Sequence, residues 1–541
     1  MVKFLESRQG LGWLKGAFAS ALVSVSSMSY AAISENLTIG NPRALSLGNA
    51  VTADPPGVDS IHYNPAGLAR VHGREGLFKL TLAYFLIQAD FGNYHPDAQQ
   101  QIDNWALGET DPVENSHSET DTIMLKIPFV DGPQEWPLPM MIVPTGGAAF
   151  RPEGTDYTLG TSVFAPLAAG YKRDDGDPGQ FMGKEMALTR LTYFSPTIGF
   201  KLNDEWSVGA GIHFSYSGIA AYTDLRVSHV ALGVINTLLT QLDDQTDCLS
   251  GLLTFCGQSM SPFEYAVGLE IDVETPLSVN AVFGALWEPT PWFTWGFVYQ
   301  TEANQRMTGS YRMTYSEDWQ GVFGAIHDEL GFLAIPLGLP VGLAEQTGDA
   351  TVELKYPAHF STGISVRVLP KWKVNIDAKW TDWAVWEGLK IEYDTKQEFN
   401  GVAAALAPEY ATSDTLIIPR HYESTWNLAF GVEHQYNDRL TLRFGWEPRK
   451  SSIPDDKQGL LLPFGDANLY SFGFGYDWME GKHFDFAIGY MHAEADIPAG
   501  SSTNANSMDI YNNILYNPYA GLDVETSVDA LLIEASYTWQ F

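Results

Sequence analysis

The residue types that could carry out catalysis are scattered along this chain of 541 residues and form no recognisable catalytic motif. We find no Gly-rich phosphate loop, no paired-cysteine zinc spacing and no nucleophile elbow. Twelve histidines in so long a chain produce chance neighbours, and we interpret His421 and His492 as strand-face residues, not as bases. We therefore expect no enzyme, no cofactor and no metal. A Ser, a His and a carboxylate that meet only in the fold remain the alternative.

Binding chemistry has better candidates among the basic residues. Each of four lies in a stretch where apolar and polar side chains alternate, and each falls on the polar face: Arg190, Arg367, Lys379 and Arg443. If that face lines an interior, such a cation could meet the carboxylate of a ligand. The alternative is that each one pairs with an Asp or Glu on the same face.

The elements that would position these cations are strands, because the alternation has a period of two. From Trp372 the apolar set is Trp372, Val374, Ile376, Ala378 and Trp380, and polar residues stand between them. A soluble sandwich would turn the apolar face inward, whereas a membrane barrel would turn it toward lipid. Alternation alone does not decide between these two folds.

The lengths of the connections favour the barrel. Short turns such as 203–204, 369–370, 437–438 and 480–481 alternate with long connections such as 93–136 and 229–262. Short turns at one end and long loops at the other are typical of outer-membrane barrels. We predict an all-β, transmembrane, antiparallel barrel of about 14 strands, near 76–92, 137–150, 155–172, 186–201, 205–228, 263–287, 292–315, 351–368, 371–394, 421–436, 439–450, 468–479, 482–497 and 526–541.

The stretch before the first strand has a different character. It is rich in small residues, with turn signals at Asp54-Pro55-Pro56-Gly57 and at Asn64-Pro65, where the proline disfavours the α conformation of Asn64. A compact irregular segment followed only by amphipathic strands predicts a barrel with a plug in its lumen.

The first 31 residues have the features of an export signal. Lys3, Arg8 and Lys15 form a positive front, 17–25 is apolar, and Ser29-Tyr30-Ala31 supplies small residues at the cleavage positions. A membrane anchor is the alternative, but the apolar part is shorter than the roughly 20 residues that a spanning helix needs. We predict a signal peptide over 1–31, an N-terminal plug over 32–74 and a barrel over 75–541.

Composition agrees with export to a membrane. A formal net charge of −34 argues against a nucleic-acid partner, whose phosphates attract Lys and Arg. The girdles of a membrane barrel would account for 16 Trp, 25 Tyr and 29 Phe. Cys248 and Cys256 lie close together in one expected loop, so we expect a disulfide in an oxidising compartment, with two free thiols as the alternative.

Several motifs, in order along the chain, resemble the FadL family of outer-membrane channels for long-chain fatty acids and other hydrophobic compounds. Asn64-Pro65-Ala66 matches the Asn-Pro-Ala motif of that family's N-terminal hatch. The likeness continues through 356–358, 370–372, 380–383, 442–445 and 452–455 to Gly489-Tyr490-Met491-His492. The last strand, which ends in Tyr537, Trp539 and Phe541, resembles the strand that the barrel assembly machinery recognises.

The resemblance implies passive uptake of hydrophobic small molecules such as fatty acids or hydrocarbons by a monomer among outer-membrane lipid and lipopolysaccharide. Asn64, Pro65 and Ala66 would belong to the hatch that gates the route. The family releases its substrate sideways beside a kinked strand. Pro166 falls inside an expected strand and cannot donate to the ladder, so Ala165, Pro166 and Ala168 are candidates for the lateral opening, with an ordinary bulge as the alternative.

The outer loops carry the remaining expectations. Apolar residues at helical spacing over 230–242 and 319–343 predict helices. In the family, the corresponding helices form a hydrophobic groove that first binds substrate; the alternative is that these apolar faces pack on each other. We interpret acidic runs such as Asp174-Asp175-Gly176-Asp177 as solvated surface, with the binding of Ca²⁺ or Mg²⁺ that bridges lipopolysaccharide as the alternative. Fatty acids, alkanes, aromatic hydrocarbons and terpenes all fit the sequence, and a barrel enzyme that acts on lipids or an importer specific for hydrocarbons is the alternative.

Overall fold

The computed structural model describes residues 39–105, 110–120, 122–227, 260–330, 340–508 and 516–541. The expected signal at 1–31, the cysteines Cys248 and Cys256, and the helical face expected at 230–242 lie outside these described residues.

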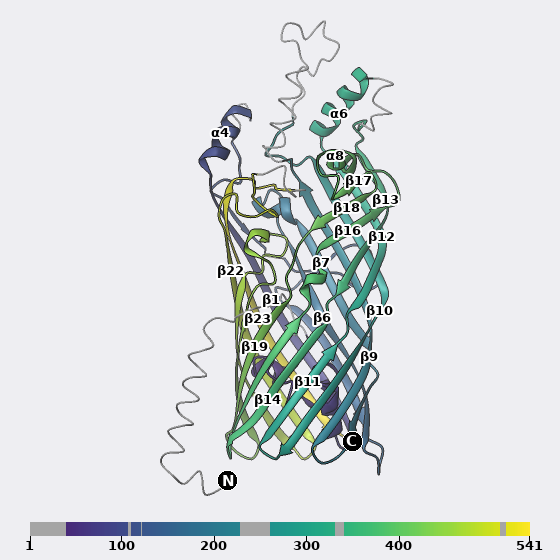
Figure 1. Cartoon of the computed structure of the whole chain (residues 1–541), viewed down its shortest axis with the longest axis vertical. Coiled ribbons are helices and arrows are strands. Elements are labelled where there is room, and N and C mark those ends of the chain that lie inside the picture. The colour runs from purple at the N-terminus through teal and green to yellow at the C-terminus, as the bar shows by residue number, and fades with distance from the viewer. Residues whose placement is uncertain (1–38, 106–109, 121, 228–259, 331–339, 509–515) are drawn as a thin grey trace.

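The chain forms a closed antiparallel barrel of 14 wall strands, which confirms the predicted fold. β1 (Arg74–Tyr94) pairs with β23 (Leu522–Gln540), so the first and last strands close the ring (Figure 1). The other uninterrupted wall strands are β5 (Met141–Phe150), β6 (Tyr157–Lys172), β9 (Trp206–Leu225), β10 (Val267–Thr290), β20 (Leu440–Arg449), β21 (Asp466–Met479) and β22 (Lys482–Ile497).

The remaining wall strands each consist of two segments with a break between them. These pairs are β7 (Glu185–Phe194) with β8 (Thr197–Lys201), β11 (Phe293–Gln300) with β12 (Ala303–Tyr315), β13 (Glu345–Tyr356) with β14 (His359–Leu369), β15 (Trp372–Thr381) with β16 (Gly388–Tyr393), and β18 (Thr415–Pro419) with β19 (Thr425–Gln435).

The two ends of the barrel differ as the connection lengths predict. At the turn end, at the bottom of Figure 1, short turns join neighbouring strands. At the loop end, at the top, lie α4 (Pro96–Trp105), α6 (Glu317–Leu330) and α8 (Glu398–Leu406). α6 begins close to the expected helical face at 319–343. In the described ranges, none of the helices has the length and apolar character needed to cross a membrane.

The period-two pattern separates two faces of the wall. On β10, Val282 and Leu286 are fully buried, whereas Phe283 between them is half exposed on the outside. Other large apolar side chains that point outward include Phe78, Leu159, Phe200, Val279, Phe444 and Phe472. The apolar face is therefore the outer face, as in a barrel surrounded by lipid and unlike a soluble sandwich.

Residues 39–71 lie inside the ring of strands near the turn end and contain α2 (Pro42–Ser46), η2 (Gly57–Asp59), α3 (Ser60–Tyr63) and η3 (Pro65–Arg70) (Figure 1). Glycine allows this inner segment to approach the wall closely. Gly48 has a φ of 61°, and a Cβ there would lie 2.7 Å from the backbone nitrogen of Trp446. Wall glycines that face the segment include Gly199, Gly209, Gly284, Gly296, Gly431 and Gly445.

Candidate functional site

Ion pairs hold the inner segment to the wall at the turn end. The Asp54 carboxylate lies 2.5 Å from Arg43, 2.6 Å from Lys373 on β15 and 3.6 Å from Arg70. Burial would raise the pKa of Asp54, but these three cations hold that pKa far below its usual range. Lys373 also pairs with Glu433 on β19 at 2.7 Å, so the network crosses from the inner segment to two wall strands.

Neutral hydrogen bonds extend this attachment around the lumen. The Asn64 side-chain amide donates to the carbonyl oxygens of Thr52 at 2.8 Å and Ala285 on β10 at 3.3 Å. Its carbonyl oxygen accepts from the Ala66 backbone N–H at 3.2 Å and so caps η3. The Thr52 backbone N–H donates to Asp377 at 2.8 Å. Asn64-Pro65-Ala66 therefore fixes the shape of the inner segment and ties it to the wall.

Above the inner segment, four cavities follow one another toward the loop end. From the loop end inward, the space free of protein atoms in and at the openings of these cavities is about 590, 900, 860 and 770 Å³. Neighbouring cavities share lining residues, so they form one interrupted route. The first and second share Leu269 and Arg420, the second and third share Met186 and Leu188, and the third and fourth share Leu167.

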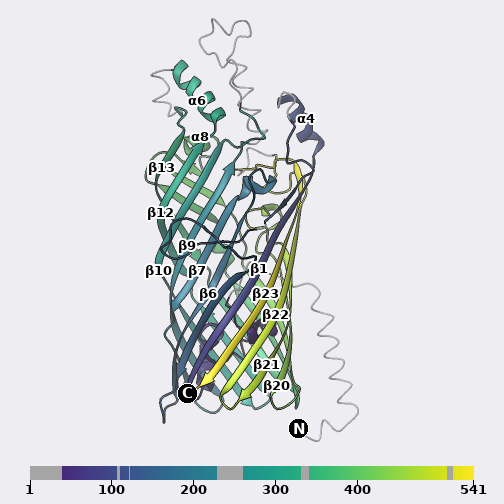
Figure 2. The same cartoon turned by 180° about the vertical axis from the view of Figure 1, so that it is seen from behind.

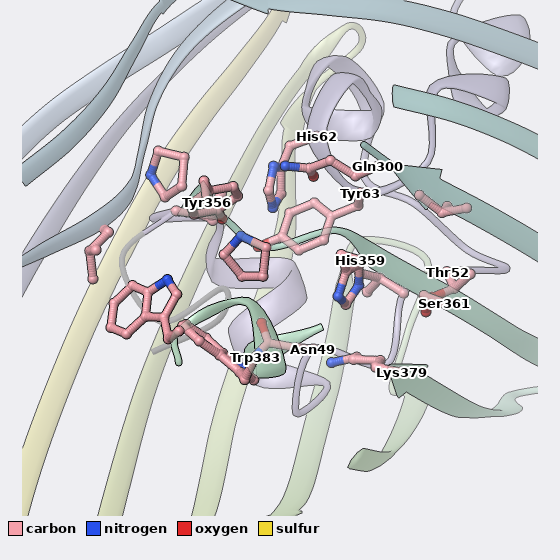
Figure 3. A pocket seen from close by; sticks show the side chains of 17 residues that line it. Asn49, Thr52, His62, Tyr63, Gln300, Tyr356, His359, Ser361, Lys379 and Trp383 are labelled. Carbon is pink, nitrogen blue, oxygen red and sulfur yellow. The ribbon is translucent and has the colours of Figure 1, made fainter. Parts of the chain in front are cut away.

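The lining changes along this route. The second and third cavities are almost entirely apolar, with residues such as Ile219, Ile271, Phe85 and Phe464. The fourth cavity borders the inner segment and has several polar side chains (Figure 3), which are Asn49, Thr52, His62, Gln300, His359, Ser361 and Lys379. A molecule with a long apolar part and one polar end would match this gradient.

Two tryptophans stand where the cavities meet. η6 (Trp383–Val385) lies in the break between β15 and β16, and both Trp383 at its start and Trp386 directly after it line the lumen. Trp386 lines the second, third and fourth cavities, and Trp383 lines the third and fourth. The two rings pack edge to face at 5.0 Å, and the Trp386 N–H donates to the Lys355 carbonyl oxygen at 2.7 Å. This fixed aromatic pair narrows the route.

The wall is irregular beside Pro166. The ladder between β5 and β6 ends at the pair Gly146–Val163, and the register between β6 and β7 shifts between Phe164 and Leu167. Pro166 lines the fourth cavity together with His62 and Tyr63 of the inner segment. Ala165 and Ala168 are buried beside it. The interruption expected from the proline is present, and its use as an exit stays a prediction.

The four cations singled out from sequence have different surroundings. Lys379 lines the fourth cavity but pairs with Glu447 at 2.9 Å, and Arg443 pairs with Glu433 and Asp485 at 2.8 and 2.5 Å. These two therefore follow the alternative of pairing with acids on the same face of the wall. Arg367 is exposed near the turn between β14 and β15.

Arg190 is the exception among the four. It is 2 % exposed, its guanidinium contacts Ser278 at 3.0 Å and Asn280 at 3.1 Å, and it stacks 4.4 Å from the Tyr356 ring. Among the described residues it has no acidic partner. Tyr356 lines the fourth cavity (Figure 3), whereas Arg190, stacked on this ring, is not among the lining residues.

Sequence reasoning missed Arg420. This residue lines the first and second cavities and has no ion pair within the part of the chain that the structure describes. It follows Pro419 at the end of β18, outside the alternating stretches, so periodicity gave no sign of its direction. Trp383 and Trp386 were visible in the sequence as aromatic residues, but nothing indicated that they enter the lumen.

Comparisons with known proteins agree with this geometry. The family described as "Outer membrane protein transport protein (OMPP1/FadL/TodX)" matches residues 20–541. A long-chain fatty acid transport protein of Escherichia coli O6:H1 is 23% identical over 296 residues, which cover 54% of this chain and 57% of that protein. The match therefore spans little more than half the length of that relative.

Solved structures share the fold. A FadL homologue from Pseudomonas aeruginosa superposes with a TM-score of 0.66 at 19% identity, and covers 95% of this chain and 100% of its own. The Ralstonia pickettii toluene transporter TbuX gives 0.56 at 15% identity, over 94% and 99% of the two chains.

Proposed function

The chain belongs to the OMPP1/FadL/TodX family of outer membrane transport proteins, and from that premise we propose that it is a passive channel for hydrophobic compounds. The turn end then faces the periplasm and the loop end faces the outside. We also propose that 1–31 is a signal peptide, that 32–74 is the hatch, and that the monomeric barrel over 75–541 is inserted by the barrel assembly machinery among lipid and lipopolysaccharide.

The outer face of the wall supports a membrane position. Exposed aromatic side chains gather near the short turns, where Trp206, Trp292, Trp372, Tyr436 and Trp478 lie. A second set lies farther along the strands, at Tyr193, Tyr299, Trp426, Tyr470 and Tyr490. Two aromatic girdles of this kind flank the apolar band of a membrane barrel.

The observation that carries the proposed function is the run of four cavities from the loop end to the hatch. A chain that leaves water for the second and third cavities gains roughly 0.8 kcal/mol for each buried methylene. This gain drives binding without an energy source. The Trp383–Trp386 pair then separates the apolar cavities from the polar one above the hatch.

Long-chain fatty acids are the substrate class that we favour. Arg420 in the outer cavities and Arg190 behind Tyr356 are cations without an acidic partner in the described ranges, and a carboxylate would satisfy either one. A neutral hydrocarbon is the second candidate, because the third cavity has an almost wholly apolar lining.

Release sideways into the bilayer is the exit that we propose. A hydrophobic molecule gains no free energy by entering the aqueous periplasm. In the bilayer its apolar surface stays out of water, which is favourable by roughly 25 cal/mol per Å². The interrupted ladder beside Pro166 opens off the fourth cavity, which supports this route.

Uptake by cells that lack their own transporter tests the proposal. Cells that produce the chain should take up radiolabelled oleate faster than cells without it, and mass spectrometry of the purified protein should identify a bound lipid. Uptake of oleate and of hexadecane no faster than in empty cells would overturn the function. Uptake of hexadecane alone would favour the hydrocarbon candidate.

A further inference from the structure

A stretch of the chain lies outside the barrel wall. Residues 122–138, here called the exterior strap, contain β3 (Met124–Leu125) and β4 (Gln134–Glu135). In Figure 2 the dark blue trace of this region crosses in front of β6, β7 and β9. The side chains of these wall strands that lie under the exterior strap point outward, because the residues next to them along each strand line the lumen.

The exterior strap lies against the place where the wall is incomplete. Thr122 forms an antiparallel bridge with Lys172 of β6, and a Cβ at Gly170 would lie 2.1 Å from the Met124 carbonyl oxygen. Trp136 packs against the cluster that contains Met141 of β5 and Ala165 and Ala168 of β6. The strap therefore fills the outside of the gap above the last β5–β6 pair.

One buried cation anchors the far end of the strap. Lys126 is 3 % exposed, and its ammonium lies 2.6 Å from Asp272 and 3.6 Å from Glu274 on the outer face of β10. The Gly132 backbone N–H also donates to Asp272 at 2.6 Å. The strap is thus a defined layer, held by contacts at both ends.

Its tip presents apolar side chains at the edge of the apolar band. Phe129 is 76 % exposed, and Ile127, Val130 and Leu138 are exposed as well. On β10 below the anchor, the outward residues change from Glu270, Asp272 and Glu274 to the exposed Leu277, Val279 and Phe283. The Phe129 ring lies 6.0 Å from the ring of Tyr216, which is level with this change. The tip therefore continues the surface that faces lipid.

We propose that the exterior strap is a cover for the lateral exit, and that its partner is the acyl region of the outer leaflet, into which Phe129 and its apolar neighbours insert. The lipid contact stands on the surface geometry alone. The role as a cover rests on the proposed function, because a cover matters only if substrate leaves beside Pro166.

The lipid contact is tested in vesicles of phosphatidylcholine. Cys248 and Cys256 are replaced by Ser, and one new cysteine is labelled with the fluorophore NBD at Phe129→Cys, at Phe283→Cys on the apolar face of β10, or at Glu409→Cys on the loop end. Spin-labelled acyl chains should quench position 129 about as strongly as position 283 and several-fold more than position 409. Quenching at position 129 equal to that at position 409 overturns the lipid contact. The same result is expected if the tip binds another protein and not lipid.

The role of the strap as a cover is tested with an engineered disulfide that can be formed and reduced. Directly opposed residues in an antiparallel pair are close enough for a disulfide, so Thr122→Cys with Lys172→Cys should tie the strap to β6. Oxidation should lower oleate uptake at least threefold, reduction should restore it, and oleate binding in detergent should not change. The single variant Thr122→Cys, treated in the same way, is the control.

The outcomes separate the cover from transport itself. If the oxidised double variant forms its disulfide and still takes up oleate as fast as it does after reduction, the strap does not cover the exit, although the proposed channel function is unaffected. If the wild-type chain neither binds nor takes up oleate, the proposed function fails and the cover fails with it.

Discussion

The two halves of the lumen are stabilised by different interactions. Near the turn end, the inner segment that we propose to be the hatch is held by partly buried ion pairs and by backbone contacts over glycine. Toward the loop end, the second and third cavities are lined by aliphatic and aromatic side chains. The first arrangement is directional and specifies one position of the hatch, whereas the second is non-directional and accepts any apolar shape that fits.

This difference teaches how one barrel can be closed and still take up a ligand. Hydrophobic contacts in the outer half exchange readily with a ligand, because a methylene of ligand replaces a methylene of protein at little cost. Charged contacts in the hatch half do not exchange with an apolar ligand. Substrate can therefore enter from the loop end without loosening the hatch, and the two halves can be altered separately.

Removal of Asp54 should have the largest effect, and it should be confined to the hatch half. Asp54→Ala leaves Arg43, Lys373 and Arg70 without their shared carboxylate. Breaking a fully buried pair costs about 3 to 5 kcal/mol, and the lower end applies here because these side chains are 16 to 30 % exposed. We expect faster hydrogen exchange over 39–71 and greater sensitivity of cells to vancomycin, with the barrel still assembled.

Asp204→Ala is the control for this prediction, because Asp204 is fully exposed at a short turn where it pairs with Lys201. It should leave both measurements unchanged. Unchanged exchange in Asp54→Ala would mean that the glycine contacts alone hold the hatch.

Trp386→Ala should alter the outer half instead. Truncation of a buried Trp lowers the free energy of unfolding by about 3 kcal/mol. Removal of the Trp386 ring also joins the three cavities that it separates in the wild-type chain. We expect a lower midpoint of thermal unfolding and faster uptake of bulky multi-ring compounds, without a gain in vancomycin sensitivity. Trp426→Ala removes an exposed outward Trp of the neighbouring strand and should not change selectivity. Equal selectivity in both variants would show that Trp386 does not limit the route.

Much of this fold could be predicted from the sequence, because the period of two and the short turns are local signals. The strand order, the barrel and the face that each alternating residue occupies follow from them. The break at Pro166 was also visible, since proline acts through its own backbone. The breaks at Ser195-Pro196 and at Trp383 are places where the alternation is interrupted for a few residues. The segments on either side of each break were therefore predicted as one longer strand.

The site was less predictable because its contacts join residues far apart in sequence. Alternation placed Lys379 and Arg443 in the lumen, but it gave no information that Glu447 and Asp485 face them. Glycines at inward positions, such as Gly209 and Gly284, were a signal that could have located the hatch contacts, because a wall residue without a side chain leaves room for another backbone.

Arg420→Gln should change which compounds the outer half prefers. A hydrogen bond to a charged group contributes about 1.5 kcal/mol or more, so affinity for oleate should fall about tenfold while affinity for octadecene stays the same. Arg312→Gln, which removes an exposed cation from the outer face of β12, is the matched control. An equal loss for both ligands would make Arg420 a packing residue and leave the anionic substrate class without its main support.

Acidification should act on the hatch alone. His62 lies on α3 of the hatch, and burial, with the nearby His213, His359 and Lys79, lowers the pKa of His62 well below its usual 6.5. The docked hatch therefore keeps His62 neutral, whereas an undocked hatch would bind a proton near pH 6.5. Docking is strongest above that pH and weakens as the pH falls below it, by up to about 1.4 kcal/mol per pH unit until the lowered pKa is reached.

Hydrogen exchange over 39–71 should accordingly be faster at pH 5 than at pH 7, after correction for the intrinsic rate. His62→Gln cannot take up the proton, so this variant should lose the part of the pH dependence that His62 supplies. A wild-type hatch equally protected at both pH values would show that proton uptake is not linked to undocking. The binding of octadecene in the apolar cavities, which contain no histidine, should be the same at both pH values.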